Sequence, residues 1–435
     1  MTSQDRSAAA NPKLLTNPLY AWCIWLLSAT FMFYKYAIEV SPSVMTRHLM
    51  STFQIDGMAL GNLAACYFYA YLIMQIPAGL LIDRFGPRRV TTLAIGLCAI
   101  GAFIFAKADT LFVASVGRFL TGAGAAFAAL NCLKIISLWF PAKRFAFMAG
   151  LMMTLAMLGA VAGQAPLSAF IDTLGWRSSM QVISACGVLL ALLFWFLVKD
   201  KDAQPIAISS AKTSPAGFFD TLRKIFKNRQ SWWLSLYSGL AFAPVSVFGG
   251  LWGVPFMSQA FSLSPTMAAH QVSLIFIGFA VGAPLIGWLS DWLGYRCKVM
   301  LWGTAIATIA ISIVLFVPDL SPWTLSFLMF TFGAAISCFL LCFTMIQEIH
   351  PPLLAATAVG FMNAFDALFG ALSDPLTGKF LDMGWTGQMV DGARYFPTGV
   401  YKMALSTLPI YLILASAFVF FIKETYCKRT LAVEK

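Results

Sequence analysis

The sequence predicts an all-α polytopic membrane protein in which twelve transmembrane helices form two pseudo-symmetric six-helix bundles. Of the 435 residues, 60% are hydrophobic and only 11% are charged, whereas soluble domains carry about 25% charged residues. A soluble fold would lack the polar side chains to cover so much apolar surface, and a bilayer removes that need. One polar loop also occurs twice along the chain, which predicts two related halves.

Apolar runs long enough to cross a bilayer follow one another along the whole chain. The first six predicted spans cover residues 18–46, 57–82, 90–107, 110–139, 146–171 and 179–198. The second six cover residues 231–256, 267–290, 298–317, 322–347, 355–380 and 401–422. We therefore predict an N-terminal bundle (1–198), a linker (199–230) and a C-terminal bundle (231–435). The first span is long for a signal peptide, so we expect it to be retained.

The basic residues predict the orientation in the membrane. With the N-terminus inside, the cytoplasmic segments hold 20 Lys and Arg residues, and the extracytoplasmic segments hold six. Both termini and the 199–230 linker are thus expected in the cytoplasm, and a bacterial inner membrane is the expected location. The formal charge of +11 follows from this asymmetry, so we expect the lipid bilayer, and no nucleic acid, as a partner. We expect a monomer.

Catalytic and metal-binding patterns are not evident in the sequence. The nine cysteines and three histidines are scattered, without the spacing of a metal site or a disulfide framework. No H-E-x-x-H helix, phosphate loop or convergent nucleophile and base is seen. We therefore predict no enzyme activity, no metal and no cofactor.

A polar loop follows the second predicted span and recurs after the eighth. The copies run from Gly79 to Arg89 and from Gly287 to Lys298. Asp, Gly and Arg recur at a constant offset, as the pairs Asp83 and Asp291, Gly86 and Gly294, and Arg88 and Arg296. Glu348, at the end of the tenth span, is expected to pair with a basic loop.

The first copy reads G-x-x-x-D-R-x-G-x-R-R, and it resembles the signature loop between helices two and three of the major facilitator superfamily. The run from Arg118 to Gly124 is similar to the R-x-x-x-G-x-G motif of that family's fourth helix. The resemblance implies the family's twelve-helix fold and secondary transport by alternating access. It assigns a gating role to Asp83, Arg84, Gly86, Arg88, Asp291, Gly294 and Arg296.

The fifth span departs from the pattern of the drug/proton antiporters, which carry G-x-x-x-G-P-x-x-G-G. Gly159 and Gly163 match, but the proline is displaced to position 166 and the final glycine pair is missing, which disfavours drug export. In the seventh span, Pro244 and the pair Gly249-Gly250 are expected to bend the helix.

Charges within the predicted spans indicate function, because a charge at the bilayer centre costs at least ~2.5 kcal/mol. Lys35 and Glu39 share one face of the first span. The run containing Tyr34, Lys35 and Tyr36 resembles the place where organic-anion members of the superfamily put a basic residue, which implies substrate binding. The alternative is a structural Lys35–Glu39 ion pair, and the two interpretations are compatible. In relatives, an arginine at the position of Arg118 serves coupling, substrate contact or helix packing.

The eleventh span carries one polar stripe at helical spacing. Its members are Asn363, Asp366, Gly370, Ser373 and Thr377. A carboxyl group removed from water favours its neutral form, so Asp366 and Glu39 are the candidate proton carriers, and Asn363 is a candidate substrate ligand.

Together these features predict a proton-coupled symporter for a small, anionic organic solute. The resemblance is greatest to the anion/cation symporter branch of the family. The alternatives are an exporter of drugs or of a metabolite such as a siderophore, a siderophore uptake permease, and a transporter-derived sensor.

Overall fold

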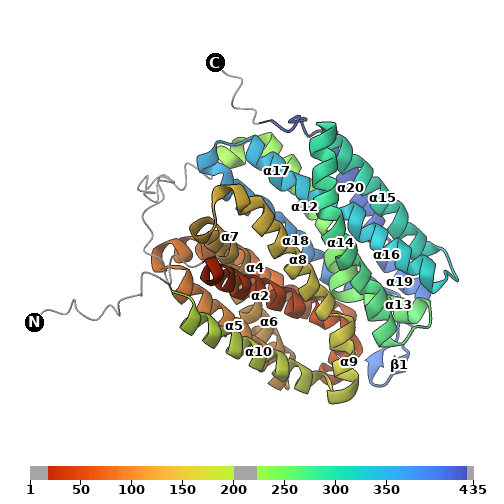
Figure 1. The fold of residues 1–435 in the computed structure, drawn as a ribbon. Coiled ribbons are helices and arrows are strands. Elements are labelled where there is room, and N and C mark those ends of the chain that lie inside the picture. Colours follow the sequence, from red (N-terminus) through yellow and green to blue (C-terminus); the bar gives the residue numbers. More distant parts are fainter. Residues whose placement is uncertain (1–17, 200–222, 429–435) are drawn as a thin grey trace, which may run out of the picture.

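A computed structural model describes residues 18–199 and 223–428, and it is almost entirely helical (Figure 1). The predicted linker 199–230 falls mostly outside the described residues. The helices of the two halves lie side by side, red to yellow-green for the first and green to blue for the second.

The first half contains, in order, α2 (Pro18–Val40), η1 (Ser41–Val44), α3 (Thr46–Phe53), α4 (Gly57–Phe85), α5 (Pro87–Lys107), α6 (Leu111–Ala125), α7 (Phe127–Trp139), η2 (Ala142–Arg144), α8 (Phe145–Ala162), α9 (Ala165–Leu174) and α10 (Trp176–Leu197). The second half contains α12 (Arg229–Pro244), η3 (Val245–Trp252), α13 (Gly253–Ala260), α14 (Pro265–Leu293), α15 (Cys297–Phe316), α16 (Pro322–Ile336), η4 (Ser337–Leu340), α17 (Leu341–Glu348), α18 (Pro352–Met383), β1 (Met389–Val390), β2 (Ala393–Arg394), α19 (Thr398–Leu405) and α20 (Thr407–Val419).

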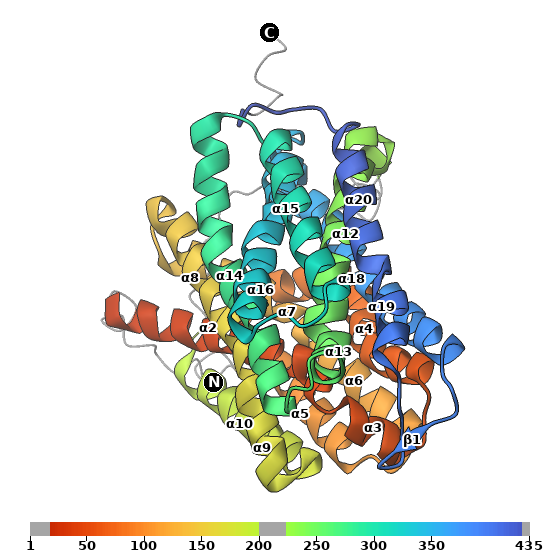
Figure 2. The same cartoon turned by 90° about the vertical axis from the view of Figure 1, so that its right-hand side faces the viewer.

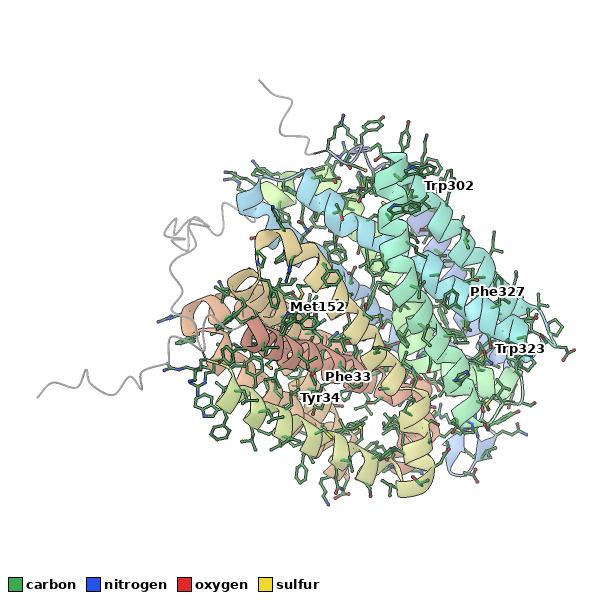
Figure 3. All side chains as sticks on the ribbon, viewed as in Figure 1. Phe33, Tyr34, Met152, Trp302, Trp323 and Phe327 are labelled. Carbon is green, nitrogen blue, oxygen red and sulfur yellow. The ribbon has the colours of Figure 1, made fainter. Side chains whose placement is uncertain are left out.

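Eleven segments of the described chain are long and apolar enough to cross a membrane. The helix α18, at 32 residues, is the remaining member of the predicted twelve, and the polar stripe of the eleventh span lies on it. Large apolar side chains point outward from the bundle, as Figure 3 shows for Trp302, Trp323 and Phe327. Their exposed fractions of 54%, 86% and 67% suit contact with lipid rather than water. The predicted fold class is confirmed.

The predicted bend of the seventh span takes the form of a π-helix. Pro244 ends α12, and residues Val245–Trp252 form η3 before α13 continues the span. A proline lacks the N–H that an α-helical ladder requires, which accounts for the change of helix type at this point. The fifth span also breaks, between α8 and α9, where Gln164 leaves the helical region of backbone angles.

The two ends of the bundle differ in how the halves meet. We call the end that carries the β1–β2 hairpin the hairpin end, and the end that carries the two copies of the repeated loop the motif end. Figure 2 shows the hairpin beside α3, and α3 packs against β2. The halves contact each other through α4 with α18 and through α8 with α14.

Glycines on the pair α4 and α18 show where these two helices touch. At the hairpin end, a Cβ atom added to Gly57 would lie 2.8 Å from the carbonyl oxygen of Gly378, and one added to Gly61 would lie 2.6 Å from Cα of Pro375. Toward the motif end, a Cβ added to Gly79 or Gly360 would meet nothing within 4 Å. The halves are therefore closed on each other at the hairpin end and diverge toward the motif end.

Candidate functional site

The candidate site begins in the last turns of α2, before the chain tightens into η1. Lys35 and Glu39 lie one helical turn apart, and their side chains form an ion pair. The two side chains are only 8% and 10% exposed. The predicted pair is thus present. An ion pair is costly to bury unless further groups surround it, which directs attention to its neighbours.

Three tyrosine rings surround the ammonium group of Lys35. Its Nζ lies 3.6 Å from the ring centroid of Tyr36, 5.3 Å from that of Tyr71 and 5.9 Å from that of Tyr67. Such distances allow cation–π attraction, which a desolvated site strengthens. The sequence interpretation missed Tyr67 and Tyr71, although their spacing of four places them on one face of α4.

Arg118, on α6, holds the end of α2 in place. Its guanidinium donates to the carbonyl oxygens of Ile38 at 2.9 Å and of Glu39 at 3.3 Å. Carbonyls in the last turn of a helix have no partner within the helix, so this residue caps α2 from a neighbouring helix. It is 2% exposed, and it also lies over the ring of Tyr67, 5.2 Å from the centroid. Of the three roles expected for Arg118, these contacts correspond to helix packing.

Tyr34 lies apart from the ion pair that Tyr36 covers. Its hydroxyl reaches α10, where a side chain added to Gly187 would collide with it. Figure 3 shows Tyr34 and Phe33 among the tightly packed helices of the first half. Successive residues of a helix point about 100° apart, so the two tyrosines that flank Lys35 serve different faces. Tyr34 belongs to the packing between α2 and α10.

The polar stripe of α18 faces two neighbours. Asn363 points across to the first half, with its Nδ2 3.5 Å from the hydroxyl of Tyr71. Asp366 instead faces α12 within its own half, where the hydroxyl of Ser238 donates to its Oδ1 at 2.6 Å. Asp366 is 5% exposed. Asn363 is therefore linked to the Lys35 cluster through Tyr71, while Asp366 occupies a separate polar position.

The first copy of the repeated loop makes a sharp corner between α4 and α5. Gly86 adopts a φ of +82°, which favours glycine, and Pro87 begins α5 directly after it. Arg88 turns back onto α10, where its Nε donates to the carbonyl of Trp195 at 2.9 Å. Arg84 is exposed and lies over the ring of Phe85. Asp83 belongs to the last turn of α4, and its side chain is outside what the structure describes.

The second copy makes a different turn and a buried charge network. Gly294, with a φ of +70°, ends α14 in the left-handed conformation. Arg296 pairs with the exposed Asp291 at 2.7 Å and with Glu348 at 3.0 Å. Burial alone would lower the pKa of Arg296, but the hydrogen bond and charge of Glu348 more than offset it, so that the pKa is raised. The expected pairing of Glu348 with a basic loop is confirmed.

The tail of the second half completes this network. The carboxylate of Glu424 accepts the backbone N–H groups of Arg296 and Cys297, each at 2.8 Å, at the start of α15. The hydroxyl of Thr425 donates to Glu348 at 2.5 Å. A helix start favours a carboxylate, so the tail fixes the loop that carries Arg296.

Residues 20–373 match the family described as Major Facilitator Superfamily. The chain belongs to this superfamily. Among solved structures, a bacterial homologue of the human lysosomal transporter Spinster, in an inward-facing and unoccupied conformation, has a TM-score of 0.78. It is 19% identical, and the alignment covers 93% of this chain and 97% of that one. The transporter fold predicted from the repeated loop is thereby confirmed.

Two relatives carry informative names. The probable L-galactonate transporter of Escherichia coli is 26% identical over 277 residues, which are 60% of this chain and 59% of that protein. The lysosomal dipeptide transporter MFSD1 of Danio rerio is 26% identical over 398 residues, covering 87% of this chain and 84% of that protein. The match therefore spans less than two thirds of the first relative and most of the second.

The cluster around Lys35 combines buried charges with aromatic rings. Two cations, Lys35 and Arg118, lie near two buried carboxylates, Glu39 beside Lys35 and Asp374 within electrostatic range of Arg118. The described residues contain no group of three or more His, Cys, Asp or Glu side chains that could hold a metal ion. Around Lys35, the groups available to bind a ligand are charged side chains, aromatic rings and tyrosine hydroxyls.

Proposed function

We propose that the chain takes up a small organic anion bearing a carboxylate, by proton symport and alternating access. The observation that carries the proposal is the buried ion pair of Lys35 with Glu39, enclosed by three tyrosine rings. A substrate carboxylate would take over the ammonium of Lys35, because a buried cation requires an anionic partner.

Proton coupling follows from the displacement of Glu39 from Lys35 by the substrate. Once a substrate carboxylate pairs with Lys35, Glu39 must take up a proton or remain an unpaired buried charge. Asp366, whose one described hydrogen-bond partner is the neutral Ser238, is the second proposed carrier. Substrate and proton would then cross the membrane in the same direction.

The direction of access follows from the closed hairpin end. We propose, on the basic-residue asymmetry, that the motif end and both termini face the cytoplasm of a bacterial cell. The arrangement in which α4 and α18 meet at Gly57 and Gly378 but not at Gly79 and Gly360 is then an inward-facing one. The gating role of the repeated loops rests on the same orientation.

A zwitterionic small peptide is the second candidate substrate. The name of the dipeptide transporter favours it, since that relative is matched over most of its length. A dipeptide offers a carboxylate to Lys35, as an aldonate does, and its ammonium would need an acidic partner such as Asp366.

The experiment that tests the proposal begins with ligand-induced thermal stabilisation of the purified protein. The panel holds aldonates, aromatic and aliphatic monocarboxylates, dipeptides and matched neutral analogues in which an amide replaces the carboxylate. Stabilisation by a carboxylate and not by its amide is expected, followed by pH-driven uptake into proteoliposomes. Equal stabilisation by the amide would refute the anion site, and uptake unaffected by collapse of the pH gradient would refute proton coupling.

A further inference from the structure

We propose that Asp382 is a latch that holds the hairpin end closed and so sets the balance between the two access states. Asp382 lies in the last turn of α18, in the second half, and its side chain is 16% exposed. The inference rests on the alternating access proposed above, but not on the identity of the substrate.

The carboxylate of Asp382 binds the start of a helix in the other half. It accepts the backbone N–H of Gly57 at 2.9 Å with one oxygen and that of Met58 at 2.7 Å with the other. These are the first two residues of α4. The N–H groups at a helix start lack partners within the helix, and the positive end of the helix dipole attracts a carboxylate. The contact therefore joins α18 to α4 through charge as well as hydrogen bonds.

A second aspartate caps the start of α4 from within the first half. Comparing the two aspartates separates the capping of α4 from the contact between the halves. Asp56, the residue before α4, accepts the N–H of Ala59 at 2.8 Å. If α4 and α18 part, Asp56 moves with α4 and keeps its contact, whereas Asp382 moves with α18 and loses both of its contacts. The bonds of Asp382 to Gly57 and Met58 thus contribute only while the hairpin end is closed.

Close packing brings the carboxylate within reach. The backbones of α4 and α18 touch at Gly57 and Gly378, where any side chain would intervene. Arg394, beside the hairpin, donates to Asp382 at 3.0 Å and lies over the ring of Trp385. It steadies the carboxylate from within the second half and does not itself cross to α4 in these contacts.

A neutral contact also joins the two halves between the fifth and seventh spans. Gln164, at the break between α8 and α9, donates to the carbonyl of Gly249 in η3 at 2.6 Å. It also accepts the hydroxyl of Ser43 at 3.0 Å.

The fifth span also contacts α14, where the hydroxyl of Thr266 donates to the carboxylate of Asp172 at 2.7 Å. Asp382 differs from Asp172 because it binds the backbone at the start of a helix in the other half. Its removal should open the hairpin end and let the motif end close.

The test is hydrogen–deuterium exchange of the full-length protein in lipid nanodiscs without substrate. In Asp382→Asn, exchange should rise about tenfold or more at residues 57–61, as expected for loss of a charged hydrogen bond. It should rise also at residues 162–166 and 246–250, which form the neutral contact. At the motif end, peptides covering residues 77–82 and 356–362 should exchange more slowly. A role confined to capping would change residues 57–61 alone.

Two further variants make the result decisive. Asp56→Ala removes a cap from the same helix start within one half, so it should speed exchange at residues 57–61 without the reciprocal change at the motif end. Gly378→Ala leaves Asp382 intact but places a Cβ against the backbone of Gly57, so it should produce the same reciprocal pattern as Asp382→Asn.

Should Asp382→Asn fail to fold, a wild-type exchange pattern in Gly378→Ala would overturn closure at this contact. A reciprocal change in Asp56→Ala, or a purely local one in Asp382→Asn, would overturn the latch. Neither outcome depends on the substrate, so the anion proposal stands or falls separately.

Discussion

Replacing Lys35 with alanine separates the two roles that its surroundings suggest. The variant leaves Glu39, with a side chain 10% exposed, without its partner. Breaking a buried ion pair by removing one member costs about 3–5 kcal/mol. If the ammonium also binds the substrate carboxylate, the variant loses a charged hydrogen bond worth roughly 1.5–3 kcal/mol, or about ten- to a hundredfold in affinity. Stability and affinity should therefore both fall, for different reasons.

The double variant Lys35→Ala with Glu39→Ala distinguishes these reasons. It removes both charges, so we expect thermal stability close to the wild type, while substrate affinity and uptake stay lost. Lys134→Ala, which removes a lysine from another span of the same half, is the control and should retain affinity. The assays are thermal unfolding in detergent, equilibrium binding of the ligand found by the screen, and uptake into proteoliposomes. Recovery of transport in the double variant would show that Lys35 is only the structural partner of Glu39.

The remaining predictions concern coupling, gating, stability and topology. Asp366→Asn should abolish accumulation against a gradient but preserve exchange between proteoliposomes without a pH difference, and wild-type accumulation would exclude it as a carrier. Asp83→Asn should slow transport while substrate affinity stays within a few fold, and a wild-type rate would remove its gating role. Arg296→Gln should lower the melting temperature, since it leaves Glu348 buried and unpaired at about 3–5 kcal/mol, and adding Glu348→Gln should recover most of the loss. A cysteine at position 210 should react only with membrane-permeant reagents in intact cells, and labelling by an impermeant one contradicts the topology.

The fold was predictable because each span carries its own signal. A run of about 20 apolar residues identifies a membrane helix without reference to its neighbours, and the repeated loop relates the halves by a fixed offset. The pair of Lys35 and Glu39 was predictable for the same reason, since a spacing of four residues fixes their proximity within one helix. The use of glycine at positions 86 and 294 also follows from a local need, a positive φ at each corner.

Contacts between spans were not predictable in this way. Tyr67 and Tyr71 enclose Lys35 only because α4 packs beside α2, and no local pattern fixes that pairing. Asp382 binds Gly57 across more than 300 residues of chain, although nothing near it in sequence indicates a partner. The sequence groups Asn363 and Asp366 on one stripe, yet one contacts α4 and the other α12. Helical periodicity gives a direction around the axis, but it does not name the helix that lies there.

The surroundings of the two proposed proton carriers predict different signatures for them. Glu39 pairs with Lys35, and a substrate carboxylate would displace Glu39 from that ammonium group. Proton uptake by Glu39 should therefore accompany substrate binding. Asp366 is held by Ser238, away from that exchange, so its protonation should depend on which end of the transporter is open to water. Substrate binding in weakly buffered solution should therefore draw protons from the medium in the wild type and in Asp366→Asn, but not in Glu39→Gln. Both variants should fail to accumulate substrate, because coupling requires proton uptake at binding and release after reorientation. Proton uptake that persists in Glu39→Gln and disappears in Asp366→Asn would reverse the assignment, with Asp366 as the group linked to binding.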